Sequence, residues 1–306
     1  MAIANVARTE IGGDPGAGLD APRRGRRRST PYLLLLPGLA WLAIFFVLPI
    51  VTLFGTSLQT PAASGEIGAF EQTFRLANYG DAVSEYLTQL VRSFLYAGIA
   101  TVLCLLIGYP LAYMIAFKAG RWRNLLLVLV VAPFFCSFIL RTLAWRQILG
   151  EEGFIVQTLK AIHVVPESMA LTASTTAVIA GLTYNFLPFM TLPLYASIER
   201  LDPRLLEAGG DLYGRPLTVL RKVTLPLTMP GIVAGTLLTF IPAAGDYVNA
   251  ALLGGVQNRM IGNVIESRFF QVVDYPTAAA LSFVLMATIL LLVILYIRRA
   301  GTEALV

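Results

Sequence analysis

The sequence predicts an all-α membrane protein with six transmembrane helices, and three observations support this prediction. Hydrophobic residues make up 57% of the 306-residue chain and charged residues only 13%, whereas average chains carry about 25% charged residues. Six segments approach or exceed the ~20 apolar residues that a helix needs to cross a bilayer. Lysine and arginine residues then gather beside alternate ends of these segments. A water-soluble fold of this length could not keep so much apolar surface away from solvent.

The six expected spans are separated by connecting stretches of varied length. They cover residues 32–54, 93–117, 125–144, 171–198, 223–245 and 275–297. Five contain no charged residue. The third carries Arg141 near its end, and Trp145 and Arg146 follow, a pattern typical of the membrane interface. We therefore expect residues 31–300 to form one transmembrane domain.

Residues 1–30 differ from the rest of the chain and are interpreted as a disordered basic tail. They contain Asp14, Pro15 and a dense arginine run from Arg23 to Arg28. The apolar stretch that follows is too long for the hydrophobic region of a cleavable signal peptide. The net charge of +5 is explained by arginines placed beside membrane spans, so no nucleic-acid partner is expected.

The distribution of positive charge predicts the orientation. With a cytoplasmic N-terminus, sixteen of the 23 basic residues fall on the inner side and seven on the outer side. Short cytoplasmic connections are rich in lysine and arginine. Both termini are therefore expected in the cytoplasm of a multi-pass protein of the inner membrane, and so is the connection between spans four and five.

Several classes of enzyme lack the residues that they need. The three lysines are Lys118, Lys160 and Lys222, and none follows a glycine, so no phosphate-binding loop of the Gly-Lys-Ser/Thr type is present. His163 is the single histidine, which argues against a zinc site or a Ser-His-Asp triad. Asp246 alone lies near a span, so an aspartate pair for intramembrane proteolysis is missing. We expect no enzymatic activity, metal or cofactor in this chain.

The connection at residues 201–226 is polar and carries its own local pattern. Pro203 is suited to the first turn of a helix, and leucines alternate with charges as far as Leu217. A turn is expected at Gly214, followed by a second amphipathic piece, and prolines then open the fifth span. The pattern predicts a helix-turn-helix on the cytoplasmic face. A solvated connector without a partner is the alternative.

The residues "EAGGDLYG…VTLP" resemble the EAA loop of inner-membrane permease subunits of binding-protein-dependent ABC importers. That pattern is Glu-Ala-Ala, three residues, Gly, nine residues and Ile-x-Leu-Pro. Gly209 replaces the second alanine, and Tyr213 occupies the glycine position, one residue before Gly214. Further segments, such as "RSFLYAGIATVLCLLIGYPLAYMIA" and "YNFLPFMTLPLYASIERLDP", resemble the first permease subunit of spermidine/putrescine importers.

This resemblance implies a type I importer permease fold and a coupling helix between spans four and five that docks on an ATPase subunit. It implies four kinds of partner: a second permease, two ATPase subunits, an extracytoplasmic substrate-binding protein and the lipid bilayer. ATP and magnesium would be bound by the ATPase subunits. The residues that the resemblance places in ATPase coupling are Glu207, Ala208, Gly209, Asp211, Tyr213, Gly214, Arg215, Leu225 and Pro226.

A polyamine path needs carboxylates, carbonyl dipoles and aromatic faces for cation–π contacts. Asp246, near the outer end of span five, is the first candidate, with Tyr247 adjacent. An interfacial acid paired with Arg259 or Arg268 is the alternative for Asp246. Tyr184 and Asn185 in span four are candidates too, with helix packing as their alternative.

Other functions remain open at this stage. The importer could carry another small solute, such as thiamine, iron or phosphonate. A stand-alone secondary transporter would work without an ATPase, although no internal repeat is apparent. A membrane scaffold without transport activity is the third alternative.

Overall fold

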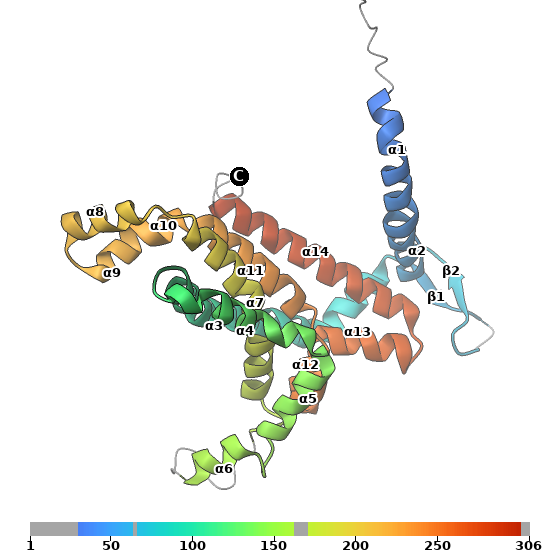
Figure 1. Ribbon diagram of the computed structural model, residues 1–306. Helices are drawn as coiled ribbons and strands as arrows, with labels where there is room; N and C mark the ends of the chain where they lie inside the picture. The colour runs from blue at the N-terminus through green and yellow to red at the C-terminus, as the bar shows by residue number, and fades with distance from the viewer. Residues whose placement is uncertain (1–29, 64–65, 162–170, 301–306) are drawn as a thin grey trace, which may run out of the picture. The chain divides into compact units, whose positions relative to one another are not determined.

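The computed structural model describes residues 30–63, 66–161 and 171–300, which are predominantly helical (Figure 1). Within these residues the two strands β1 (Gln59–Pro61) and β2 (Phe70–Gln72) form an antiparallel hairpin, with Thr60 opposite Glu71. Except for Thr30, the expected basic tail lies outside the described residues, and so does His163.

The chain divides into two compact units, residues 1–51 and 52–306. The described part of the first unit is helical and consists of α1 (Thr30–Leu42), the π-helical η1 (Ala43–Val47) and the first residues of α2 (Leu48–Ser57). Residues Leu35–Ser57 are long and apolar enough to cross a membrane. This helix corresponds to the expected first span at residues 32–54.

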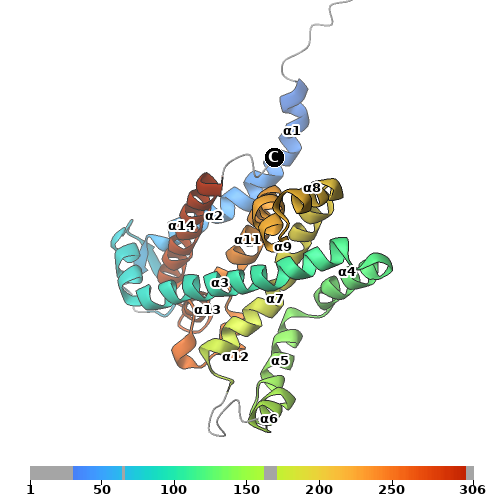
Figure 2. The same cartoon turned by 90° about the vertical axis from the view of Figure 1, so that its left-hand side faces the viewer.

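The second unit contains the remaining helices. In chain order they are α3 (Ala77–Phe117), η2 (Gly120–Trp122), α4 (Arg123–Val131), η3 (Ala132–Phe135), α5 (Phe138–Ile148), α6 (Phe154–Ala161), α7 (Thr175–Glu199), α8 (Pro203–Tyr213), α9 (Pro216–Val219), η4 (Leu220–Thr224), α10 (Leu225–Leu227), α11 (Met229–Ala244), α12 (Val248–Leu253), η5 (Val256–Asn258), α13 (Ile261–Phe270) and α14 (Tyr275–Ala300). Figures 1 and 2 show α8 and α9 at one end of α7, and α5 and α12 toward its other end.

Helices α3, α7 and α11 pack closely in the core because small residues lie where they cross. A Cβ atom at Gly231 would lie 2.5 Å from Ser197 Cβ, and one at Gly235 would lie 2.8 Å from Met190 Sδ. Both glycines belong to α11 and sit four residues apart, which brings one helix face against α7. Close approach at a small-xxx-small pattern is typical of helices that pack within membranes.

Two expected spans are broken rather than continuous, which corrects the prediction for residues 125–144 and 223–245. The third bends by 97° between η3 and α5, and the fifth bends by 71° between α10 and α11. At the first break the backbone is extended at Cys136, after a 3-10 turn that contains Pro133. At the second, Thr228 leaves helical geometry just before Pro230. Among the described residues, four helices are long and apolar enough to be single spans, or up to six if each bent pair counts as one span.

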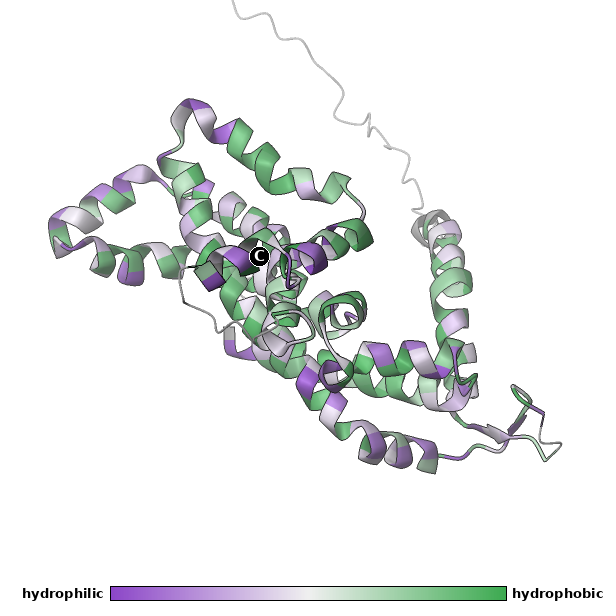
Figure 3. Cartoon of the chain, turned by 90° about the horizontal axis from the view of Figure 1, so that it is seen from below, coloured by the Kyte–Doolittle hydropathy of each residue, from purple (hydrophilic) through white to green (hydrophobic). Residues whose placement is uncertain are grey.

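The other expected spans match single helices with shifted ends. Helix α3 begins at Ala77, well before the expected residue 93, and a kink at Tyr86 separates its two parts. Figure 3 shows mostly hydrophobic residues along the helices of the bundle, whereas hydrophilic and hydrophobic residues alternate along α8 to α10, at the left as in Figure 1. The composition of these helices therefore suits lipid better than that of the loop at residues 203–227 does.

Candidate functional site

Residues 203–227 are called the coupling loop below, after the role that the resemblance implies for them. The first helix of this loop, α8, starts where the sequence predicts. The side chain of Asp202 accepts a hydrogen bond from Arg204 N at 3.0 Å, and Pro203 occupies the first helical position. The first N–H groups of a helix have no partner within the helix. An aspartate cap accepts a hydrogen bond from one of them, and a proline at the first position has no N–H that needs a partner. These two local signals fix the start of α8 immediately after α7.

Gly214 makes the turn that ends α8. Its φ is +66°, and its N–H donates to Gly210 O at 2.7 Å. A left-handed residue at the end of a helix is usually glycine because a Cβ atom is strained in that conformation. The turn thus falls one residue after the glycine position of the EAA pattern, as the sequence suggested.

Tyr213, which stands at the pattern's glycine position, has a role of its own in the loop. It is the last residue of α8, and its ring lies 4.6 Å from Lys222 Nζ in η4. This cation–π contact links the two arms of the loop across the turn. The tyrosine is therefore accommodated because its helical backbone needs no glycine and its side chain remains partly exposed.

Gly209 is the buried residue of α8 and marks the contact between the loop's two arms. A Cβ atom at this position would lie 3.2 Å from Val219 Cγ1 and 3.3 Å from Val223 Cγ2. Such distances are tighter than ordinary van der Waals contact, so alanine would displace the valines. This close packing explains why a glycine stands where the EAA pattern has its second alanine.

The outward face of the loop combines charges with large apolar side chains. Leu212 and Leu217 are each 74% exposed. Glu207, Asp211 and Arg215 are exposed too, and no ion pair among the described residues includes them. Apolar residues rimmed by unpaired charges are typical of a protein interaction surface. Leu225 and Pro226 close the loop within α10, where the chain turns into α11.

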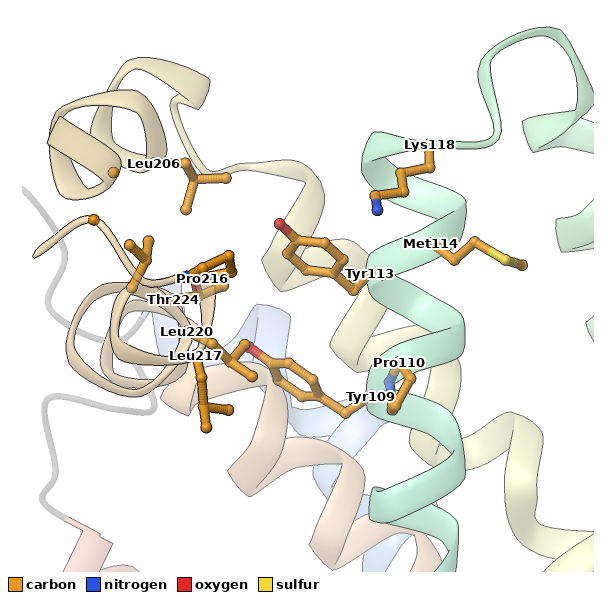
Figure 4. A pocket seen from close by; sticks show the side chains of 13 residues that line it. Tyr109, Pro110, Tyr113, Met114, Lys118, Leu206, Pro216, Leu217, Leu220 and Thr224 are labelled. Atoms are coloured by element: carbon orange, nitrogen blue, oxygen red, sulfur yellow. The ribbon is translucent and has the colours of Figure 1, made fainter.

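A cleft of about 830 Å³ separates the loop from the end of α3 (Figure 4). Tyr109 and Tyr113 of α3 line it together with Lys118, the residue that follows this helix, and the Tyr113 ring points toward the loop. Leu206 and Leu220 are among the loop residues that line the other side. Tyr109 Oη lies 3.0 Å from Thr228 Oγ1, so α3 is hydrogen-bonded to the break at which α11 begins. The residue that follows the loop is therefore bonded to α3, while the cleft separates the loop itself from the end of α3.

Asp246, the predicted path residue, is buried just beyond the end of α11. Its Oδ1 accepts a hydrogen bond from Asn249 N at 2.8 Å, which caps the start of α12. Burial raises the pKa of this carboxyl to about 6, and the hydrogen bonds to Asn249 act in the opposite direction. No ion pair of the described residues includes Asp246, so the expected pairing with Arg259 or Arg268 is not found there. Arg268 instead pairs with Glu85 and Asp274.

Asn185 belongs to a buried polar cluster and not to an open surface. Its Nδ2 donates to Asn249 Oδ1 at 2.9 Å and to Thr142 Oγ1 at 3.2 Å. This cluster joins α5, α7 and α12, so packing is the better description of Asn185. Asn185 Oδ1 and Asn249 Nδ2 are buried without a hydrogen-bond partner.

The two tyrosines proposed for the path lie in different surroundings. The Tyr184 ring lies 5.3 Å from the Trp145 ring of α5, and Tyr184 is only partly buried. Tyr247 is 48% exposed, and its backbone oxygen accepts from Asn263 Nδ2 at 2.7 Å. The structure thus brings Asp246, Tyr247 and Asn185 to the neighbourhood of α12, whereas Tyr184 contacts Trp145 of α5.

Two groups of polar contacts were missed by the sequence analysis. Asn249 follows Asp246 by three residues, a spacing typical of a side chain that caps the next helix, and this signal was available. Arg123 contacts Tyr195 and Glu199 of α7. Its partners are more than seventy residues away, so no local pattern reveals them.

Comparison with known proteins decides the family. The family described as "Binding-protein-dependent transport system inner membrane component" matches residues 108–301, which include the whole coupling loop. The chain belongs to this family. Its relatives are inner-membrane permease subunits, so the resemblance inferred from the EAA loop is confirmed.

Several curated relatives are similar over most of their length. The spermidine/putrescine transport system permease protein PotB of Escherichia coli (strain K12) is 37% identical over 261 residues, which cover 85% of this chain and 94% of that protein. PotB of Haemophilus influenzae is 39% identical over 260 residues, covering 85% and 90%. The inner membrane ABC transporter permease protein YdcU of Escherichia coli is 31% identical, covering 88% and 89%.

A solved structure supports the fold. A chain of a bacterial ABC transporter involved in the import of alginate has a TM-score of 0.70 and 17% sequence identity, covering 90% of this chain and 94% of that one. At this identity the likeness concerns the fold alone. It confirms the expected type I permease architecture of a helical membrane protein.

Proposed function

We propose that this protein is the first of the two permease subunits of an ATP-driven polyamine importer. The observation that supports it most is the 37–39% identity to PotB proteins over 85% of the chain. The loop that resembles the EAA pattern forms an exposed helix-turn-helix, which also agrees with a permease subunit. In this proposal the chain forms half of the translocation pathway and catalyses no reaction itself.

The proposed complex contains a second permease, two ATPase subunits and an extracytoplasmic substrate-binding protein. Both termini and the coupling loop would face the cytoplasm, because sixteen of the 23 basic residues then lie on that side. ATP and its magnesium ion would be bound by the ATPase subunits. The coupling loop would present Leu212, Leu217 and Glu207 to one of them.

The mechanism that we propose is alternating access driven through the loop. Helix α8 follows α7 after three residues, and α10 leads into α11 at Thr228. Because α7 and α11 pack tightly at Gly231 and Gly235, a displacement of α8 would move their inner ends together. Bistable rigid-body movement of packed helices is a common way to transmit such a change.

The substrate path remains a proposal on four residues. A polycation is attracted by a carboxylate and by aromatic faces. Asp246 would supply the negative charge of this path. Tyr247 and Tyr184 would offer ring faces, while Asn185 would hold α12 in place through Asn249.

The substrate is tested by uptake into proteoliposomes that contain the complete complex. We expect ATP-dependent accumulation of labelled spermidine, and competition by unlabelled putrescine. Thiamine, iron and phosphonate should not compete. Competition by one of these solutes, without competition by putrescine, would contradict the polyamine assignment. Uptake by this chain without ATPase subunits would instead favour a secondary transporter.

The coupling role is tested in the same vesicles with Glu207→Lys. Reversing this exposed charge should leave the protein inserted but separate ATP hydrolysis from uptake. Glu71→Lys, an exposed acid in strand β2, is the matched control and should retain coupling. Normal uptake by the Glu207 variant would contradict the proposed contact between Glu207 and an ATPase subunit.

A further inference from the structure

The inner half of the third span is weakly anchored by apolar packing. No residue of α4 is buried, and only partly buried residues, such as Leu126 and Val130, contact the core. The chain then breaks at Cys136, so α4 is not held in line by α5. Apolar burial alone therefore does not fix the position of α4, and polar contacts carry more weight.

Arg123, the first residue of α4, makes such contacts with α7. Its Nε donates to Tyr195 Oη, its Nη2 pairs with Glu199 Oε1, and its Cζ lies 5.2 Å from the centre of the Tyr195 ring. Tyr195 is a buried member of the core. The ion pair is partly exposed, so it contributes little stability alone. The guanidinium also lies over the Tyr195 ring and donates to the Tyr195 hydroxyl, and together these contacts fix its orientation.

The contacted residues lie immediately before the coupling loop. Glu199 is the last residue of α7, and α8 begins at Pro203. The connection is short and ordered, because Leu201 N donates to Ile198 O and Asp202 caps α8. A displacement of α8 must therefore move Glu199. Because Arg123 pairs with Glu199, this movement would be passed on to α4.

We propose that Arg123 is a positioning residue that ties α4 to the inner end of α7, so that a movement of the coupling loop carries the inner half of the third span with it. This inference rests on the proposed function, since it assumes an ATPase that moves α8. It adds a second route from the loop into the membrane, beside the direct connections to α7 and α11.

The experiment compares Arg123→Gln with Arg121→Gln in the complete complex. Arg121 is the matched control, because its guanidinium lies 5.4 Å from the Trp122 ring and no ion pair of the described residues includes it. For each variant, uptake and ATP hydrolysis are measured in the same vesicles, together with the thermal stability and subunit content of the complex.

We expect Arg123→Gln to lower the uptake per ATP hydrolysed by about fivefold, which is at the lower end of the range of effects typical of coupling between two sites. Arg121→Gln should change this ratio little. The exchange Arg123→Glu with Glu199→Arg should recover part of the ratio, since the ion pair is restored while the contact with Tyr195 is lost.

An unchanged ratio in Arg123→Gln would overturn the inference, and so would an equal decrease in Arg121→Gln. Loss of thermal stability with an unchanged ratio would show a purely structural role and overturn it too. Failure of the proposed function is distinguishable, because the unmodified complex would then show no ATP-driven polyamine uptake.

Discussion

Two polar segments flank α11, one with exposed leucines and the other with buried polar side chains. The coupling loop before α11 exposes Leu212 and Leu217 to solvent. The segment after α11, residues 245–263, instead buries Asp246, Asn249 and Asn263 among helices. The two leucines leave most of their surface exposed, whereas the buried polar groups are largely hydrogen-bonded inside the chain.

This difference indicates which segment needs another protein. Exposed apolar side chains surrounded by charge gain from a partner that covers them. Buried polar groups that bond one another stabilise an internal junction instead. The loop is therefore the better candidate for contact with the ATPase, while the outer segment fixes α12 against α5 and α7. Four substitutions test this distinction, from the largest expected effect to the smallest.

Gly214→Pro should have the largest effect. Proline fixes φ at about −65°, so it cannot adopt the φ of +66° that Gly214 has in the turn. It also has no N–H to donate to Gly210 O. We expect near-complete loss of uptake, with the amount of inserted protein unchanged. Gly210→Ala is the control, because its Cβ has no neighbour within 4 Å. Uptake assays with immunoblots of the membrane fraction check this, and normal transport by Gly214→Pro would contradict the role of the turn.

Gly181→Ala tests the internal junction on the other side of α11. Its Cβ would lie 2.3 Å from Leu253 Cδ1 and 2.8 Å from Asn249 Oδ1, so these two side chains of α12 must move. Such overpacking costs about 1–3 kcal/mol. Thermal unfolding of the purified complex should show the loss, while binding of the ATPase stays unchanged.

Gly98→Ala is the matched control for this substitution, since Gly98 lies within α3 and its Cβ would meet nothing within 4 Å. The comparison between the two segments would be weakened if Gly181→Ala reduced ATPase binding and left thermal unfolding unaltered.

Leu212→Glu should produce the reverse pattern. The side chain is exposed, so thermal stability should change by less than about 0.5 kcal/mol, as for most surface substitutions. Binding of the ATPase should weaken by about 1–2 kcal/mol if this leucine fills a pocket at the interface. Co-purification at graded ATPase concentrations measures it, and unaltered binding would argue against Leu212 as a contact.

Gly209→Ala should have the smallest effect. The added methyl group meets flexible valine side chains at 3.2 and 3.3 Å, and alanine favours helix. We expect a modest decrease in coupling that Val219→Ala relieves in the double variant. Measurement of uptake per ATP hydrolysed checks both. An equal decrease with and without Val219→Ala would show that this contact is not the cause.

The sequence predicted some of these features because they depend on local chemistry. The capped start of α8 and the turn at Gly214 follow from Asp202, Pro203 and the glycine itself. The spans follow from length and composition. Their breaks were not predicted, because Pro110, Pro188 and Pro242 lie inside continuous helices while Pro133 accompanies a break. A proline leaves a backbone carbonyl without its helical partner, and neighbouring helices determine whether that carbonyl finds another hydrogen-bond donor.

The surroundings of Asp246 and Arg123 depend on contacts between distant residues. Asp246 is buried because α12 folds back onto α7 at Gly181, sixty-five residues earlier in the chain. Arg123 was counted for orientation alone, since Tyr195 and Glu199 belong to another span. Hydropathy and charge patterns carry no information about such pairs.

The central claim, that the coupling loop is the ATPase contact, is tested most directly by cysteine labelling. Leu212→Cys and Ile67→Cys place exposed thiols on the loop and near strand β2 in a background with Cys136→Ser. Each is labelled with a maleimide in permease complexes with and without ATPase subunits, in the absence of the binding protein. The account predicts that the ATPase protects position 212 and leaves position 67 reactive. Equal labelling of position 212 in both preparations would contradict it.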